Sequence, residues 1–185
     1  MTAPPYRRRN LRLPAFDYST PGTYFVTICV QDRACILGDV VDGETVLSSV
    51  GHLAAIHLQM AADRFDDVEL DAHVIMPNHV HLLLNLGWNV GAPLEPVRAV
   101  TEAPMPMPTS LDRIVHWFKS ATTNEYIRRV RSEGWRRFPG TLWQRNYYEH
   151  IVRDQSDLDR IRTYIANNPA KWEMDTEYLP ECRGF

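Results

Sequence analysis

Two histidines separated by one residue, His79 and His81, form the first pair of side chains that could bind a metal ion. They follow Met-Pro-Asn and precede an apolar run, a pattern typical of a turn that leads into a strand. Because side chains alternate along a strand, both imidazoles project from one face and Val80 projects from the other. Two imidazoles about 7 Å apart along a strand can converge on one cation. Taken alone, however, a His-x-His pair in a chain with seven histidines is more often a chance pair.

A second pair, Tyr164 and Asn168, occupies positions i and i+4 of a predicted helix that stops at Pro169. Residues at this spacing share one helix face. If the helix covers the histidine face, Asn168 completes a His-His-Asn metal site and Tyr164 points at whatever the metal binds. The alternative is a half-buried core tyrosine and an asparagine at a helix end.

The predicted elements that position these residues follow the order β-α-β-β-α-β-α. We expect strands at 24–30, 70–76, 79–84 and within 142–152, and helices at 49–63, from about 110 to before Gly134, and from Asp154 or Ser156 to Pro169. The first six elements match the ferredoxin-like plan, an antiparallel sheet with two helices on one face. The predicted fold class is therefore α+β, with an added C-terminal helix on the open face that carries Tyr164.

The length of 185 residues fits one compact domain, and we predict a single domain over residues 1–185. Residues 1–20 form a basic, proline-bearing arm in this interpretation. Residues 87–109 contain Gly and a Met-Pro-Met-Pro run, which indicates a Pro-rich loop insertion without a core of its own.

The charge distribution bears on nucleic-acid binding. The formal net charge is −3, which argues mildly against a protein whose main task is to hold nucleic acid. The signs are segregated, however: arginines cluster at 7–12 and 128–137, and acids at 63–71 and 173–181. Arginine has a planar fork that suits phosphate and can stack on bases.

The three cysteines form no Cys-x-x-Cys pair, which indicates reduced thiols and a cytoplasmic location. No apolar signal core follows the basic N-terminus, and the apolar runs are too short to span a membrane, so we expect no membrane partner.

Five segments, taken together, resemble one known family. They are residues 22–27, 76–82, 118–120, 142–153 and 164–169, in that order. They are similar to the REP-associated tyrosine transposases, relatives of the single-strand insertion-sequence transposases within the His-hydrophobic-His endonuclease superfamily. The resemblance covers most of residues 20–172 and leaves out the Pro-rich stretch and the acidic tail.

The resemblance implies a role for each matching residue. His79 and His81 would bind a divalent cation, Mg²⁺ or Mn²⁺, and Asn168 falls where the related enzymes place their third ligand. Tyr164 would be the nucleophile. The implied substrates are single-stranded DNA hairpins from repetitive extragenic palindromes, cut and rejoined through a covalent phosphotyrosine. The implied oligomeric state is a monomer or a homodimer.

Candidate phosphate contacts are the basic side chains near these motifs. Lys119, Arg145 and Arg153 lie within or next to the matching segments, although surface cations are common. In the basic arm the resemblance suggests that a short tetranucleotide beside the hairpin is read, by Arg7, Arg8, Arg9 and Arg12. A basic tail without that function is the alternative.

Several neighbours leave alternatives open. His73 could replace Asn168 as a ligand if the turn before His79 held an odd number of residues, but a buried strand histidine is the more common case. Tyr147 and Tyr148 are rival nucleophiles. Because side chains alternate along a strand, we interpret one as pointing into the core and the other as lying at its rim. Other side chains with a possible accessory role in orienting ligands, moving protons or stacking on bases are Glu149, His150, Trp117, Trp135 and Trp143.

Two other functions compete with a strand-transferring enzyme. One is a non-catalytic module that binds single-stranded DNA or RNA hairpins, which would not need all four site residues. The other is a metal-dependent hydrolase that activates water, which would not need Tyr164. A covalent tyrosyl ester conserves bond energy, so a free 3′-OH can attack it later.

Overall fold

The computed structural model describes residues 20–87 and 109–180. The predicted arm at 1–20 and the predicted insertion at 87–109 lie almost wholly outside these residues. Their interpretation stays a prediction.

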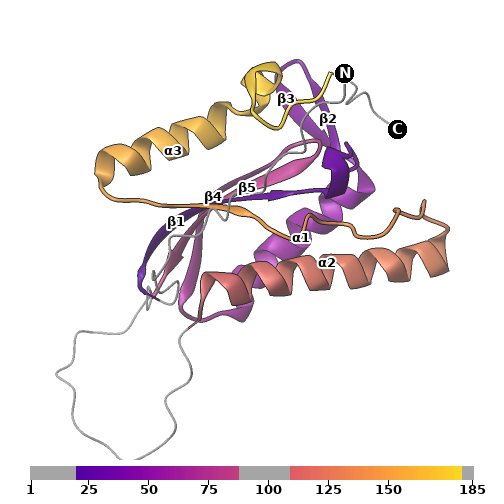
Figure 1. The fold of residues 1–185 in the computed structure, drawn as a ribbon, viewed down its shortest axis with the longest axis horizontal. Coiled ribbons are helices and arrows are strands. Elements are labelled where there is room, and N and C mark those ends of the chain that lie inside the picture. The colour runs from indigo at the N-terminus through magenta and orange to yellow at the C-terminus, as the bar shows by residue number, and fades with distance from the viewer. Residues whose placement is uncertain (1–19, 88–108, 181–185) are drawn as a thin grey trace, which may run out of the picture.

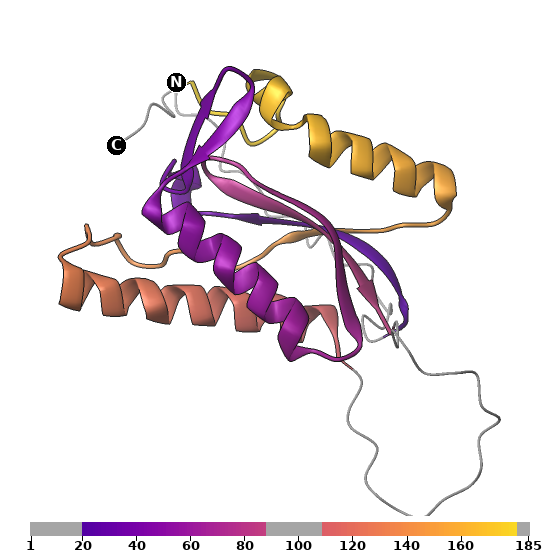
Figure 2. The same cartoon turned by 180° about the vertical axis from the view of Figure 1, so that it is seen from behind.

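A four-stranded antiparallel sheet forms the centre of the fold, with the strand order β4-β5-β1-β6. Its strands are β1 (Gly22–Cys29), β4 (Val68–Ile75), β5 (His79–Leu86) and β6 (Tyr148–Ile151). Helices α1 (Ser49–Arg64) and α2 (Leu111–Glu133) pack side by side on one face, and α3 (Gln155–Asn167) lies on the other (Figures 1 and 2). This arrangement confirms the predicted α+β, ferredoxin-like sheet with an added helix.

A short hairpin between β1 and α1 was not predicted. It consists of β2 (Gly38–Val41) and β3 (Glu44–Leu47). Asp42 and Gly43 at its turn both have positive φ, 52° and 79°, as a two-residue primed turn requires. The Asp-Gly pair was the available sequence signal, but strands of four residues with alternating exposed side chains leave little apolar pattern to read.

The main core lies between the sheet and helices α1 and α2. Alternate residues of β1, such as Tyr24 and Val26, point to this side and are almost fully buried, as are Val80 and Leu82 of β5. At the start of α1, the side chain of Ser48 accepts hydrogen bonds from the first backbone N–H groups, which fixes where the helix begins.

A smaller core holds α3 against the opposite face. Phe25 of β1 and Leu83 of β5 pack against Ile161 and Ile165 of the helix. Because these helix residues are four apart, they form one apolar stripe, which the half-buried Leu158 extends.

Polar contacts fix the helix position further. Arg162 donates two hydrogen bonds to Asp71 of β4, at 3.0 and 2.6 Å. His150 of β6 contacts the Asp157 carboxylate at 2.7 Å, and Asp154 accepts from the backbone N–H of Asp157 as N-cap. After α3 the chain continues into a short 3-10 turn, η2 (Pro169–Met174).

Among residues 20–87 and 109–180, no helix has the length and apolar character that crossing a membrane would require.

Candidate active site

The histidine pair lies at the start of β5, directly after a two-residue turn. Ile75 pairs with Val80, Met76 bonds His79 through the backbone, and Pro77 and Asn78 form the tip. His79 and His81 both face α3 and are 0% and 2% exposed. Their Nε2 atoms are 2.9 Å apart, which confirms that the two imidazoles converge.

The remaining ring nitrogen of each histidine has a hydrogen-bond partner. Asn78 Oδ1 lies 2.8 Å from His79 Nδ1, and Thr27 Oγ1 lies 2.9 Å from His81 Nδ1. Burial, and then the neighbouring His81, lower the pKa of His79 well below its ordinary value. His79 is therefore neutral near pH 7, the form in which imidazole binds metal ions.

Helix α3 covers the histidine face, as the sequence argument required. The Tyr164 hydroxyl lies 3.1 Å from His81 Nε2, and its ring packs edge-on against Phe25. The residue remains 39% exposed, although its hydroxyl contacts the buried His81.

Asn168, at the end of α3, also lies next to the site, but its side-chain amide bonds Asp175, a contact that the sequence did not predict. It is 2% exposed, and its Nδ2 donates to Asp175 Oδ2 at 2.8 Å. Its Oδ1, the predicted ligand atom, is buried without a hydrogen-bond partner among the described residues. A buried amide oxygen without a partner is costly unless a cation or donor satisfies it.

Asp175 is the site residue that sequence reasoning missed. Its carboxylate accepts a hydrogen bond from the Tyr164 hydroxyl at 2.7 Å. Its oxygens lie 3.9 and 3.7 Å from the Nε2 atoms of His79 and His81, so these three side chains form a possible metal site. Only the turn η2 brings the acidic tail back to the histidines, and α-helical spacing after Tyr164 does not reveal it.

The protonation of the tyrosine and the aspartate follows from their contacts. Burial, and then the hydrogen bond to Asp175, raise the pKa of Tyr164. For Asp175, burial favours the neutral form, but the neighbouring His81 and the hydrogen bonds from Asn168 and Tyr164 together hold its pKa well below the usual range. The site thus pairs a protonated phenol with an ionised carboxylate.

The donor set fits a hard or borderline divalent cation. Two imidazole nitrogens with amide or carboxylate oxygens suit Mn²⁺ or Mg²⁺. The two histidine nitrogens, 2.9 Å apart, are close enough to hold one such ion together.

Lys119 has a role in the fold that differs from the predicted phosphate contact. Its ammonium donates to the carbonyl oxygens of Gln144, Arg145 and Asn146 at 2.9, 3.3 and 3.1 Å. These bonds fix the loop before β6. Arg145 and Arg153 are exposed, and the arginines of the N-terminal arm lie outside the described residues.

The sheet register shows which of the rival ligand and nucleophile residues face the histidine pair. His73 pairs with Leu82, so it faces away from the histidine pair, and the turn holds an even number of residues. Tyr147 donates to Asp112 on the helix side, whereas Tyr148 pairs with Thr27 and is 43% exposed on the histidine side.

The tryptophans named as possible stacking platforms lie in aromatic clusters of the core. Trp143 is buried and donates to Thr122. Trp117 and Trp135 are half-buried against Phe65 and Tyr126. Packing accounts for all three.

The expectation of reduced cysteines is wrong for Cys35, which is disulfide-bonded. Cys29 keeps a free thiol. Burial, and then the nearby Glu177, raise the pKa of Cys29 to about 12, so this thiol is not a nucleophile near neutral pH.

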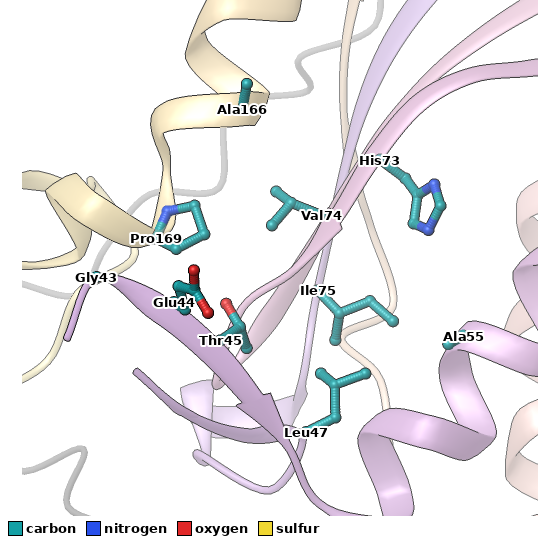
Figure 3. A pocket seen from close by; sticks show the side chains of 10 residues that line it. All are labelled: Gly43, Glu44, Thr45, Leu47, Ala55, His73, Val74, Ile75, Ala166 and Pro169. Atoms are coloured by element: carbon teal, nitrogen blue, oxygen red, sulfur yellow. The ribbon is translucent and has the colours of Figure 1, made fainter. Parts of the chain in front are cut away.

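A cavity of about 490 Å³ lies next to the site, between β3, β4 and the end of α3 (Figure 3). Thr45, His73, Ala166 and Pro169 are among its lining residues, but the histidine pair and Tyr164 are not. The groups that can do chemistry are therefore gathered outside this cavity, under α3.

Comparisons with known proteins point to one family. The family model described as "Transposase IS200 like" matches residues 103–168, which include Tyr164 and Asn168. An uncharacterised protein of Haemophilus influenzae is 31% identical over 179 residues, covering 94% of each chain. A putative REP-associated tyrosine transposase of the same organism is 25% identical over 156 residues, covering 84% of this chain and 74% of that protein.

A solved structure shows the same fold. It is described as a REP-associated tyrosine transposase bound to a REP hairpin, and it matches with a TM-score of 0.55 at 15% identity over 94% of each chain. The sheet, the tyrosine helix and these relatives together define a DNA-processing protein of the transposase class. The chain belongs to the IS200-like transposase family.

Proposed function

We propose that this protein is a metal-dependent enzyme that cleaves and rejoins single-stranded hairpin DNA through a covalent phosphotyrosine at Tyr164. The observation that carries this proposal is the 3.1 Å contact between the Tyr164 hydroxyl and His81 Nε2, made by two separate elements. The names of two similar proteins, a REP-associated tyrosine transposase and one bound to a REP hairpin, support repetitive extragenic palindromes as the hairpin class.

His79 and His81 would hold a Mg²⁺ or Mn²⁺ ion together with an oxygen of Asn168 or Asp175. When bound there, the ion neutralises charge on the scissile phosphate and orients it for in-line attack. Two observations support these oxygens as ligands: Asn168 Oδ1 is buried without a hydrogen-bond partner among the described residues, and the Asp175 carboxylate lies within 4.8 Å of the ligand atoms of both histidines.

Tyr164 supplies the nucleophile, and Asp175 accepts its proton. Attack forms the bond from the phenol oxygen to phosphorus and breaks the bond from phosphorus to the leaving oxygen of the DNA. The leaving oxygen takes up one proton and departs as a hydroxyl, which balances the proton that Tyr164 gives to Asp175. Because the pKa of Tyr164 is raised, the phenol needs a proton acceptor, and the 2.7 Å hydrogen bond to Asp175 provides one. A free 3′-OH then reverses the chemistry on the tyrosyl ester.

The test is formation of a covalent adduct. Labelled hairpin DNA is incubated with the protein and Mn²⁺ or Mg²⁺, denatured, and resolved by electrophoresis. We expect an adduct with the wild type and none with Tyr164→Phe. Tyr148→Phe is the matched control, because Tyr148 is also an exposed tyrosine on this face, and it keeps the adduct.

An equal adduct from Tyr164→Phe contradicts the proposal. Hairpin binding without any adduct favours the non-catalytic binding protein, and metal-dependent cleavage that leaves no adduct favours a hydrolase that uses water.

A further inference from the structure

Two buried side chains contact the ring nitrogens of the histidines that do not face each other. Asn78 is 0% exposed and Thr27 is 5% exposed. Each contacts the Nδ1 atom of one histidine, at 2.8 Å for His79 and 2.9 Å for His81. Neither side chain has a role in the chemistry described above, yet together they determine which ring nitrogens are free to bind a cation.

Asn78 leaves His79 one choice of tautomer. Its Nδ2 donates to the backbone carbonyl of Glu177 at 2.9 Å, so the amide is oriented with its Oδ1 toward the ring. An amide oxygen only accepts hydrogen bonds, so His79 Nδ1 must carry the proton. The Nε2 atom of His79 then keeps its lone pair, which is the atom that faces His81.

Thr27 is compatible with both neutral tautomers of His81. A hydroxyl can donate or accept, so it bonds Nδ1 in either tautomer. Without a cation, two Nε2 lone pairs at 2.9 Å would repel each other. Because Asn78 fixes His79, the proton between the rings belongs to His81 Nε2, and Thr27 donates to His81 Nδ1. When a cation binds, the proton moves to Nδ1 and the Thr27 hydroxyl rotates to accept it.

We propose that Asn78 and Thr27 are positioning residues of the metal site. Asn78 fixes His79 in the Nδ1-protonated form, and Thr27 accommodates the proton of His81 with and without the cation. This inference rests on the proposed function where it concerns metal binding, but the tautomer of His79 is a property of the metal-free protein.

The test combines two measurements on the full chain. Nitrogen-15 NMR of the imidazole rings reports the tautomers without metal, and we expect His79 to be protonated at Nδ1 and His81 at Nε2. Electron paramagnetic resonance of free Mn²⁺ reports affinity. Asn78→Ala and Thr27→Val should each weaken Mn²⁺ binding by about 10- to 100-fold, whereas Thr27→Ser, which retains the hydroxyl, binds like the wild type.

Thr23→Val is the matched control. Thr23 lies on the same strand and face as Thr27, but its hydroxyl bonds Asn85 at 2.6 Å instead of a site histidine. It should leave both the His81 tautomer and the Mn²⁺ affinity unchanged.

Each possible result either supports the proposal or overturns it. Wild-type affinity in Asn78→Ala and Thr27→Val overturns the proposal, as does a His79 ring protonated at Nε2. If the wild type binds no Mn²⁺, the proposed metal site is wrong. The NMR measurement of the His79 tautomer still tests whether Asn78 fixes the proton on Nδ1. If Asn78→Ala does not fold, the comparison of Thr27→Val with Thr27→Ser decides, and equal affinities overturn the inference.

Discussion

At the scale of single residues, the site joins the histidines of a strand with two side chains that lie more than 80 residues later in the chain. His79 and His81 come from β5, Tyr164 from α3, and Asp175 from the segment after η2. The alternation of a strand predicts the histidine pair, and the i to i+4 spacing of a helix predicts Tyr164 beside Asn168. Asp175 could not be predicted in this way, because its position depends on how η2 turns back over the sheet.

Asp175 should control the ionisation of Tyr164, the proposed nucleophile. Replacing it with Asn removes a carboxylate that raises the pKa of Tyr164, so that pKa falls, while burial keeps it above the ordinary value of about 10. NMR titration of ring-labelled tyrosine measures this. Asp159→Asn, on the exposed side of α3, is the control, and an unchanged pKa in Asp175→Asn would show that the carboxylate does not act on the phenol.

His79 should make stability depend on pH. Its pKa is lowered in the folded state, so the unfolded chain binds more protons as the pH falls through about 6.5. The metal-free protein is therefore expected to lose stability between pH 7 and pH 5. Urea unfolding at several pH values should show a shallower loss for His79→Gln; the same slope in both proteins would contradict this assignment. His73, whose pKa burial also lowers, contributes to the slope that remains.

At the scale of elements, the position of α3 places Tyr164, the proposed nucleophile, beside the histidines of the proposed metal site. The apolar stripe of Ile161 and Ile165 predicts that the helix packs on something, and the open sheet face supplies the surface. The sheet order and helix sides followed from the ferredoxin-like plan. The hairpin of β2 and β3 and the turn η2 did not, because short elements carry too little periodic pattern.

Removing one residue of this stripe should weaken the whole element. Ile161→Ala is expected to lower the free energy of unfolding by about 2–5 kcal/mol and to increase amide exchange in α3. Ile56→Ala provides the matched control, since Ile56 is 60% exposed on α1 and its loss should cost less than about 0.5 kcal/mol. Similar losses from both substitutions would mean that α3 is not held by this core.

At the scale of the whole molecule, a net charge of −3 is compatible with binding DNA because the basic residues are segregated. Electrostatic binding then depends on which cations are free to meet phosphates. Lys119 of α2 donates to three backbone carbonyls of the loop before β6, whereas the side chain of Arg145 in that loop is exposed.

This difference predicts opposite behaviour for two substitutions. Arg145→Ala should leave stability unchanged and reduce the dependence of hairpin binding on the logarithm of salt concentration by about 0.7–1. Lys119→Met should instead lower the melting temperature, because three carbonyl oxygens lose their donor. Fluorescence anisotropy over a salt series measures the first effect, and thermal unfolding measures the second. A lower melting temperature only in Arg145→Ala would contradict the structural role of Lys119.

The most direct test of the account is to locate the covalent bond to DNA. Adduct formed with hairpin DNA and Mn²⁺ is digested with trypsin, which releases Tyr164 on the peptide 163–171 and the rival Tyr147 and Tyr148 on the peptide 146–153. Tandem mass spectrometry should find the nucleotide on Tyr164 in peptide 163–171. A nucleotide on peptide 146–153, or unmodified peptides from a protein that has cleaved its DNA, would contradict Tyr164 as the nucleophile.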